Sequence, residues 1–209
     1  MNTINLKFRE TDNDLFGQSK WWGAPDLPED WDYPEMLDEN GDPIPLIFLC
    51  QIKCADLVNY DKENRLPHKG MLYFFAAVED YLEDYDFGLS CPVLNHYGEW
   101  SKQAFKVLYS PTTDNLSTLE VSWDDESIHL PEEAITFSLE GDEEFYLLGY
   151  PEDPEVTEQC PSYINLLQVG EEDRWSLRFF DCGLLNFLIK PEDLEKRNFD
   201  NVIAYLTYC

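Results

Sequence analysis

Basic residues are scarce in this chain of 209 residues: 14 Lys and Arg stand against 43 Asp and Glu, which gives a formal net charge of −29. Nucleic acid and anionic membrane surfaces repel such a charge, so we expect neither as a partner. Long apolar runs are also lacking. The longest, residues 71–78, is far too short to span a bilayer. The N-terminus has no apolar segment typical of an export signal, and we therefore expect a cytoplasmic protein.

The familiar catalytic motifs are missing as well. The sequence has no Walker A loop, no Gly-x-Ser-x-Gly elbow, no His-Glu-x-x-His and no Gly-x-Gly-x-x-Gly fingerprint. Its three histidines, His68, His96 and His129, lie far apart, and each is more typical of an ordinary histidine than of a general base. We therefore name no catalytic residue and no cofactor. A non-enzymatic role is favoured over an enzyme of unrecognised type.

Metal-binding patterns are incomplete. Cys50 and Cys54 have no second close pair, as a structural zinc site requires. Asp38, Asn40 and Asp42 resemble the start of a calcium loop, but the glycine and glutamate that such a loop needs are missing, and Asn40-Gly41 favours a tight turn. We expect no metal. In a reducing compartment all six cysteines would be thiols; they are Cys50, Cys54, Cys91, Cys160, Cys182 and Cys209.

What the chain does have is enough apolar material for a core, with 44% hydrophobic and 15% aromatic residues. Short runs rich in aromatic and branched residues predict strands. They cover residues 46–52, 71–78, 105–109, 134–139, 163–169, 175–180 and 184–189. Helical patterns are few and short: residues 54–60, residues 191–198 with proline first, and a weaker candidate at 12–19. The fold class predicted is α+β, mainly β, with few short helices.

An internal repeat indicates two related halves. In the first copy an apolar strand with Gln51 (residues 48–52) is followed by a loop, a glycine and a second apolar strand (residues 69–75). In the second copy the strand with Gln168 (residues 165–169) is followed by a loop, a glycine and another apolar strand (residues 182–188). The alternative is that any two buried strands look alike. We favour an internal duplication within one domain, residues 1–209. Its parts would be subdomain 1 (about 20–110), a linker and acidic region (about 111–144) and subdomain 2 (about 145–209).

Four segments together resemble the YwqG-like family, a bacterial domain of unknown function. They are residues 22–28; 45–52 with 66–75; 147–151 with Gln159 and 166–168; and 180–189 with Asp193, Leu194 and Phe199. The chain departs from the family where Phe179-Phe180 stand in place of a tryptophan-glycine pair. The resemblance implies a mainly β, duplicated fold, and it brings no established activity and no catalytic residues. Some members of such families occur beside secreted toxins, so it also implies an immunity role.

A long acidic stretch suggests the kind of partner. Residues 107–173 contain no Lys or Arg and 18 Asp and Glu. Clustered like charge repels itself, and a partner rich in Lys and Arg relieves that repulsion. We therefore expect a non-enzymatic module that binds a basic protein, such as a toxin. The partner-binding candidates are Asp124, Asp125, Glu126, Asp142, Glu143 and Glu144. The alternative is a solvated acidic surface without a partner.

A second hypothesis is a small-molecule or peptide binding module with its pocket between the two halves. It rests on the aromatic, proline-rich opening of the chain, in which Trp21, Trp22, Trp31 and Tyr33 could line a groove. The alternative for these aromatics is that they plug the ends of the sheet.

Overall fold

The computed structural model describes residues 2–89, 96–141, 144–151, 153–180 and 182–208. These residues form one large antiparallel sheet. Its strands are β1 (Ile4–Arg9), β2 (Lys20–Trp21), β6 (Ile47–Lys53), β7 (Met71–Ala76), β8 (Gly98–Glu99), β9 (Phe105–Ser110), β13 (Glu133–Ser138), β14 (Tyr146–Gly149), β15 (Ile164–Val169), β16 (Leu184–Ile189) and β17 (Ile203–Thr207). Their order across the sheet is β8-β17-β16-β15-β14-β1-β13-β2-β6-β7-β9.

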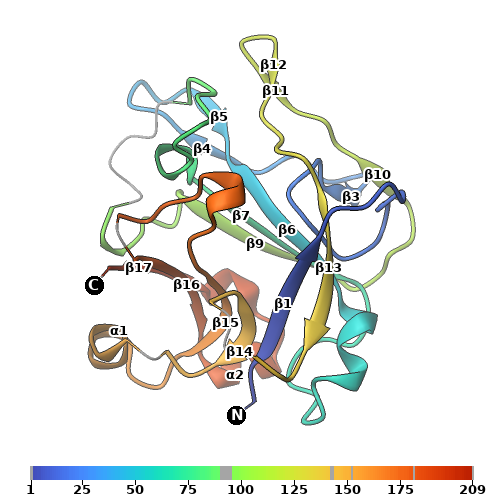
Figure 1. Ribbon diagram of the computed structural model, residues 1–209, viewed down its shortest axis with the longest axis vertical. Helices are drawn as coiled ribbons and strands as arrows, with labels where there is room; N and C mark the ends of the chain where they lie inside the picture. Colours follow the sequence, from blue (N-terminus) through green and yellow to red (C-terminus); the bar gives the residue numbers. More distant parts are fainter. Residues whose placement is uncertain (1, 90–95, 142–143, 152, 181, 209) are drawn as a thin grey trace.

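The sheet curls so that its two arms face each other (Figure 1). β1 and β13 lie in the middle of the strand order. We call β2, β6, β7 and β9 the first half, and β14, β15, β16 and β17 the second half. The rings of Phe74 in β7 and Phe187 in β16 lie 5.4 Å apart, so the two arms share one core. Buried aromatic and branched side chains from both halves form this core, as fits strands that are covered on one face or both.

Three small two-stranded sheets and several short helical segments complete the fold. One pairs β3 (Asp26–Pro28) with the distant β10 (Leu116–Thr118). The other two are hairpins, β4 (Glu35–Leu37) with β5 (Pro43–Pro45) and β11 (Ser122–Trp123) with β12 (Glu126–Ser127). The helical segments are α1 (Pro154–Gln159), α2 (Pro191–Glu195), and the 3₁₀ turns η1 (Cys54–Asn59), η2 (Glu79–Tyr81), η3 (Asp173–Trp175) and η4 (Phe199–Asn201).

The predicted mainly β fold with few short helices is confirmed. Six of the expected strands correspond to β6, β7, β9, β13, β15 and β16, and the expected helical segments at 54–60 and 191–198 correspond to η1 and α2. The strand expected at 175–180 is wrong. Ser176 and Phe180 have φ of 50° and 68°, a left-handed backbone that cannot continue a pleated strand. The helix expected at 12–19 is also wrong, since this segment consists of turns.

The two halves have corresponding registers. Gln51 lies opposite Tyr73, and Gln168 opposite Asn186; in each case an irregularity in the pairing comes just before the glutamine. A Cβ on Gly70 would lie 1.9 Å from Ser110 O, and a Cβ on Gly183 would lie 2.2 Å from Phe179 O, so both glycines permit the close backbone approach expected before the second strand. This agreement is what the duplication hypothesis predicts; a common origin of the halves stays a hypothesis.

Three cysteines are buried thiols. Cys50, Cys54 and Cys160 are free, and burial raises their pKa, that of Cys54 to about 12. Cys182, in contrast, is disulfide-bonded, so the expectation of six thiols is wrong. Sequence spacing does not reveal which sulfurs meet in space. Cys91 and Cys209 lie outside the described residues. In the described part of the chain no helix has the length and apolar content needed to cross a membrane.

Candidate functional site

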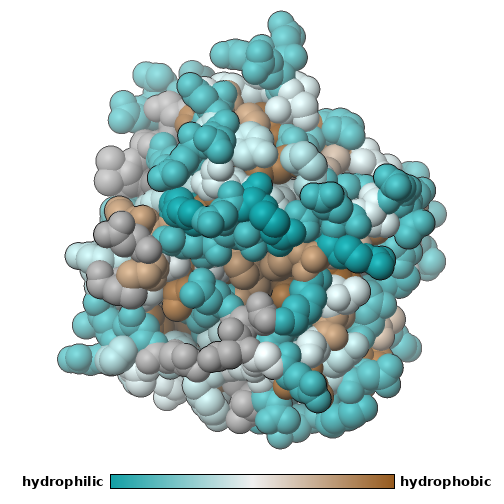
Figure 2. Space-filling model, viewed as in Figure 1, coloured by the Kyte–Doolittle hydropathy of each residue, from teal (hydrophilic) through white to brown (hydrophobic). Residues whose placement is uncertain are grey.

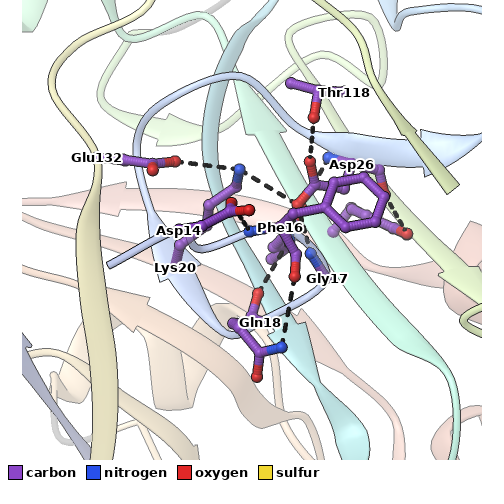
Figure 3. A network of polar contacts seen from close by, with 10 residues as sticks. Asp14, Phe16, Gly17, Gln18, Lys20, Asp26, Thr118 and Glu132 are labelled. Atoms are coloured by element: carbon purple, nitrogen blue, oxygen red, sulfur yellow. Dashed lines mark hydrogen bonds and ion pairs between the residues drawn. The ribbon is translucent and has the colours of Figure 1, made fainter. Parts of the chain in front are cut away.

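A charged pocket in the first half is the most distinctive site. We call it the Lys20 pocket; its volume is about 380 Å³. The chain segment around β2, the start of β3, and the segments before and after the β11–β12 hairpin form its walls (Figure 3). The lining residues are Asp14, Phe16, Lys20, Gly23, Ala24, Asp26, Thr118, Glu120, His129, Leu130 and Glu132.

Lys20 lies in the pocket because of strand alternation. Successive side chains of a strand point to opposite faces. In β2, Trp21 enters the aromatic core, where its ring stacks on that of Trp175 at 5.5 Å. Lys20 therefore points the other way, and only 2% of it is exposed. Its Nζ lies 3.2 Å from Asp26 Oδ2 and 3.2 Å from Glu132 Oε2. A buried ammonium group persists only with partners of this kind.

Asp26 forms the floor of the pocket and is fully buried. Its Oδ2 accepts hydrogen bonds from Gly17 N (2.9 Å) and Gln51 Nε2 (2.7 Å) in addition to the contact with Lys20. Its Oδ1 accepts one from the Thr118 hydroxyl at 2.7 Å. Both carboxylate oxygens are thus satisfied. Asp26 holds the pocket together and has little capacity left for a ligand.

The mouth of the pocket carries carboxylates of a different kind. Asp14, Glu120 and Glu132 are exposed. Glu120 lies 3.9 Å from the Nε2 atom of His129. That atom accepts a hydrogen bond from Val121 N at 2.9 Å, so it carries no proton and the ring is neutral. Burial lowers the pKa of His129, in agreement with a neutral ring. The charge of Glu120 is therefore not balanced by His129.

The family model that matches this chain is described as a domain of unknown function, DUF1963, and it matches residues 19–147 and 139–208. The chain belongs to this family. Both matches together include every residue of the Lys20 pocket except Asp14 and Phe16. No curated protein matches the chain. Membership of the DUF1963 family brings no known activity, so the function of this chain has to be inferred from the geometry of its candidate site.

The second half contains a matching but uncharged arrangement. Gln51 Nε2 donates to Gln18 O, and Gln168 Nε2 donates to Glu144 O, so each glutamine holds the backbone that enters β2 or β14. A similar segment with glycine and proline follows β2 at residues 22–25 and begins within β14 at residues 148–151. The first residues of these segments, Trp22 and Leu148, have φ of 58° and 56°.

The matching strands differ at one position. Lys20 lies opposite Gln51, whereas Tyr146 lies opposite Gln168. The Tyr146 hydroxyl donates to Gln168 Oε1 at 2.7 Å and accepts from Asn165 Nδ2 at 2.8 Å. In the second half, the neutral side chains of Tyr146, Gln168 and Asn165 thus lie where the first half has the buried Lys20 and its carboxylate partners.

The predicted partner-binding acids fall into two groups. Asp124, Asp125 and Glu126 are exposed on the β11–β12 hairpin, which projects from the top of the molecule in Figure 1. The pocket residues Glu120 and His129 flank this hairpin on either side. Glu144 precedes β14, and Figure 1 shows β14 in the lower part of the molecule, away from the β11–β12 hairpin. Asp142 and Glu143 lie outside the described residues. The structure therefore joins the first group to the Lys20 pocket and separates Glu144 from it.

The predicted groove aromatics are packed inside the protein or against its core. Trp21 and Trp22 are fully buried. The half-buried Trp31 contacts the ring of Tyr73, and Tyr33 contacts that of Phe75 and donates to Leu46 O at 2.9 Å. The two tryptophans at 21 and 22 therefore offer no surface to a ligand.

The sequence-based metal candidates take structural roles. Among the described residues, no group of three or more His, Cys, Asp or Glu side chains is arranged to hold a metal ion. The Asp38 carboxylate accepts from Asn40 N and Asp42 N, both at 2.8 Å, in the turn between β4 and β5. These backbone hydrogen bonds lower the pKa of Asp38. Asn40-Gly41 lies in that turn, as expected.

The Lys20 pocket is not predicted by the sequence patterns described above. One signal was present: Lys20 is the only Lys or Arg between Arg9 and Lys53, and it lies in a segment of apolar and aromatic residues. An isolated base beside two tryptophans suggests a buried ion pair. Its partner Glu132 is 112 residues away, a contact that spacing does not reveal.

Proposed function

We propose that this protein is a non-enzymatic binding module for a basic protein, and that it docks its partner on the β11–β12 hairpin and the mouth of the Lys20 pocket. The observation that carries the proposal is the balance of charge on this side of the molecule. The hairpin contributes Asp124, Asp125 and Glu126, and the mouth of the pocket adds three more carboxylates. Among the described residues that line the pocket, Lys20 is the one Lys or Arg, and it is buried.

The geometry of the hairpin supports a docking role. Asp124 and Asp125 have φ of 50° and 68°, as required at both central positions of the tightest hairpin turns. Asn-Gly or Asp-Gly is the favoured sequence there, because aspartate carries a conformational cost that glycine does not. Two aspartates therefore place charge at a projecting tip where charge does not help the fold. Such a tip steers a basic protein during diffusional encounter.

A basic toxin is one partner with the required chemistry, and it would make the protein an immunity protein. The resemblance to the YwqG-like family and the toxins encoded beside some members of such families support this narrower form of the proposal. A bacterial, cytoplasmic protein would fit it. In a nuclease toxin the basic cleft normally binds phosphates, and the carboxylates of the hairpin would imitate them.

The test begins with capture of a partner from a lysate of the source organism at low salt, followed by association kinetics with the purified partner. The variant combines Asp124→Lys, Asp125→Lys and Glu126→Lys. We expect association to slow by about tenfold or more at low salt and its salt dependence to flatten, because electrostatic steering raises association rates by ~10- to 1,000-fold. Capture alone does not count as support.

The matched control is the combination of Glu83→Lys, Glu158→Lys and Glu195→Lys. These residues are exposed and lie outside the Lys20 pocket and the hairpin. The control changes the net charge by the same amount, so it separates a docking surface from a general effect of charge. Equal slowing by both triple variants, or no slowing by either, would show that the hairpin is not the docking surface.

A second candidate function is small-molecule or peptide binding between the two halves. The pocket that comes nearest to this description has a volume of about 370 Å³ and lies between β1 and the second half; it is lined by Leu6, Phe8 and Phe145 together with Glu144, Glu171, Glu172, Arg174 and Lys7. Figure 2 shows hydrophobic atoms gathered in a hollow near the centre of this face. Apolar walls with a few charged groups are typical of ligand sites. A ligand screen that finds binding sensitive to Phe8→Ala would favour this function.

A further inference from the structure

The mouth of the Lys20 pocket combines carboxylates with an exposed aromatic ring. Phe16 lines the pocket and is 46% exposed, so its ring is accessible to a ligand. The exposed carboxylates of Asp14, Glu120 and Glu132 line the same pocket, and Figure 3 shows Asp14 and Glu132 near the buried Lys20, with the Phe16 ring on the side of Asp26. A flat ring beside carboxylates is the environment that a planar cation requires.

The charges in the pocket leave a negative excess. Lys20 is the one cation among the described residues that line it, and this lysine already contacts Asp26 and Glu132. Four carboxylates and one ammonium group leave three net negative charges in the pocket, since the His129 ring is neutral. A ligand that fills this pocket and gains from its field is therefore positively charged.

His129 supplies a donor that the fold does not use. Its side chain is only 6% exposed, and it lines the pocket. Because Nε2 accepts from Val121 N, the ring proton is on Nδ1, and among the described residues we find no hydrogen-bond partner for this N–H. An N–H donor that lines a pocket and has no partner among the described residues is free to donate to an acceptor of a ligand. A peptide carbonyl is such an acceptor.

We propose that the Lys20 pocket binds one arginine side chain of a partner protein. The guanidinium group lies against the Phe16 ring and pairs with the Glu132 carboxylate, and a backbone carbonyl of the same segment accepts the hydrogen bond from His129 Nδ1. Arginine fits better than lysine, because its planar group stacks on aromatic rings, forms two parallel hydrogen bonds with a carboxylate and is more weakly hydrated. The inference rests on the proposed function and specifies the group that the partner inserts.

The test uses blocked arginine, N-acetyl-arginine methylamide, as the probe in a titration followed by NMR. Blocked citrulline has nearly the same shape without the charge, and blocked lysine has the charge without the planar group. We expect saturable arginine binding with a Kd on the order of 1 mM, as for a ligand of this size. Blocked lysine should bind about three- to tenfold more weakly than blocked arginine. Blocked citrulline should show no saturation even at a concentration of about ten times the Kd of arginine.

Two variants locate the site. Glu132→Gln and Phe16→Ala should each weaken arginine binding about fivefold or more. Phe16 is exposed, so its removal leaves the core intact and keeps the test valid if Glu132→Gln should fold poorly. The control is Glu144→Gln, which changes an exposed carboxylate of the second half and should leave arginine binding as it is.

The inference is overturned if citrulline binds as well as arginine, if arginine does not bind at all, or if folded Phe16→Ala binds arginine like the unchanged protein. These outcomes differ from a failure of the proposed function. If the hairpin reversals slow association while arginine does not bind, the acidic docking surface stands and only the arginine pocket is wrong.

Discussion

The two halves of the sheet solve the same structural problem with different chemistry. In each, a buried glutamine holds the backbone that enters a short strand, through Gln18 O in the first half and Glu144 O in the second. The first half then buries Lys20 with carboxylates, whereas the second half uses the neutral hydroxyl of Tyr146.

This difference teaches which groups the fold needs. A buried ion pair is costly to desolvate, and well-packed neutral groups often stabilise a protein as well or better. The second half shows that the turn after the strand forms without buried charge. We infer that the charges of Lys20, Asp26 and Glu132 serve a purpose beyond folding, which is why the candidate site is placed in the first half.

The largest expected effect comes from breaking the buried pair on one side. Asp26→Ala leaves Lys20 with one partner and removes the acceptor of Gly17 N, Gln51 Nε2 and Thr118 Oγ1. Loss of one partner of a buried pair costs about 3–5 kcal/mol. We therefore expect the free energy of unfolding, measured by urea denaturation, to fall by about this amount. A loss below about 1 kcal/mol would mean that the pair is not buried as described.

The matched variant removes both charges. Lys20→Met with Asp26→Asn keeps the side chains close in size and makes the first half neutral, like the second. We expect this double variant to recover most of the stability that Asp26→Ala loses, since replacement of a buried pair is often neutral or stabilising. If it is as unstable as Asp26→Ala, the two charges are needed for folding and the comparison of the halves misleads.

A smaller effect is expected in the second half. Tyr146→Phe removes the hydroxyl that donates to Gln168 Oε1 and accepts from Asn165 Nδ2. A buried polar group left without its partner costs about 1–3 kcal/mol. Denaturation should show a loss in this range, with partner and arginine binding unchanged. A change in binding would show that the second half is part of the site.

The hairpin should respond in the opposite direction. Asp124→Asn with Asp125→Gly places the favoured turn sequence at two positions of positive φ. We expect the free energy of unfolding to rise by about 0.5–1 kcal/mol, while association with a basic partner slows. Greater stability combined with weaker binding is typical of a functional site. A fall in stability would show that the two aspartates serve the fold.

The smallest effect concerns pH. Burial lowers the pKa of His129, so the folded protein binds a proton there less readily than the unfolded chain. The unfolded state then binds more protons as pH falls below the ordinary histidine value of about 6.5, and stability decreases in that direction. Thermal melts at pH 7.5 and pH 5.5 should show a larger loss in the unchanged protein than in His129→Gln. Equal losses would mean that His129 titrates normally.

Much of the fold was predictable because buried strands have strong local patterns. Residues 71–78 and 184–189 are apolar throughout and correspond to β7 and β16. Residues 4–9 were not predicted as a strand, although Ile4, Leu6 and Phe8 alternate with polar residues as in a half-buried strand. This strand, β1, lies in the middle of the sheet.

Two local signals explain the remaining errors in the fold. Residues 175–180 have a strand-like composition, but Ser176 and Phe180 adopt left-handed backbone conformations that a composition cannot reveal. The helix α1 follows Asp153 and begins with Pro154, a strong start signal that was overlooked; the Asp153 carboxylate accepts from Glu155 N at 2.7 Å.

The candidate site was only partly predictable. The excess of acid was evident from composition, and Asp124, Asp125 and Glu126 are indeed exposed at a projecting tip. The pocket beneath them depends on long-range contacts, such as that of Thr118 with Asp26, which join segments about ninety residues apart. No local pattern encodes these contacts, so the pocket had to come from the structure.

The most direct test of the central claim is to map arginine binding residue by residue. Blocked arginine is titrated into the ¹⁵N-labelled protein, and amide chemical shifts are followed in both halves. The account predicts saturable changes at residues 14–26 and 118–132, with the matching positions at 146–151 and 164–169 unchanged. Changes confined to the second half, or centred on Phe8 and Phe145 beside β1, would contradict it.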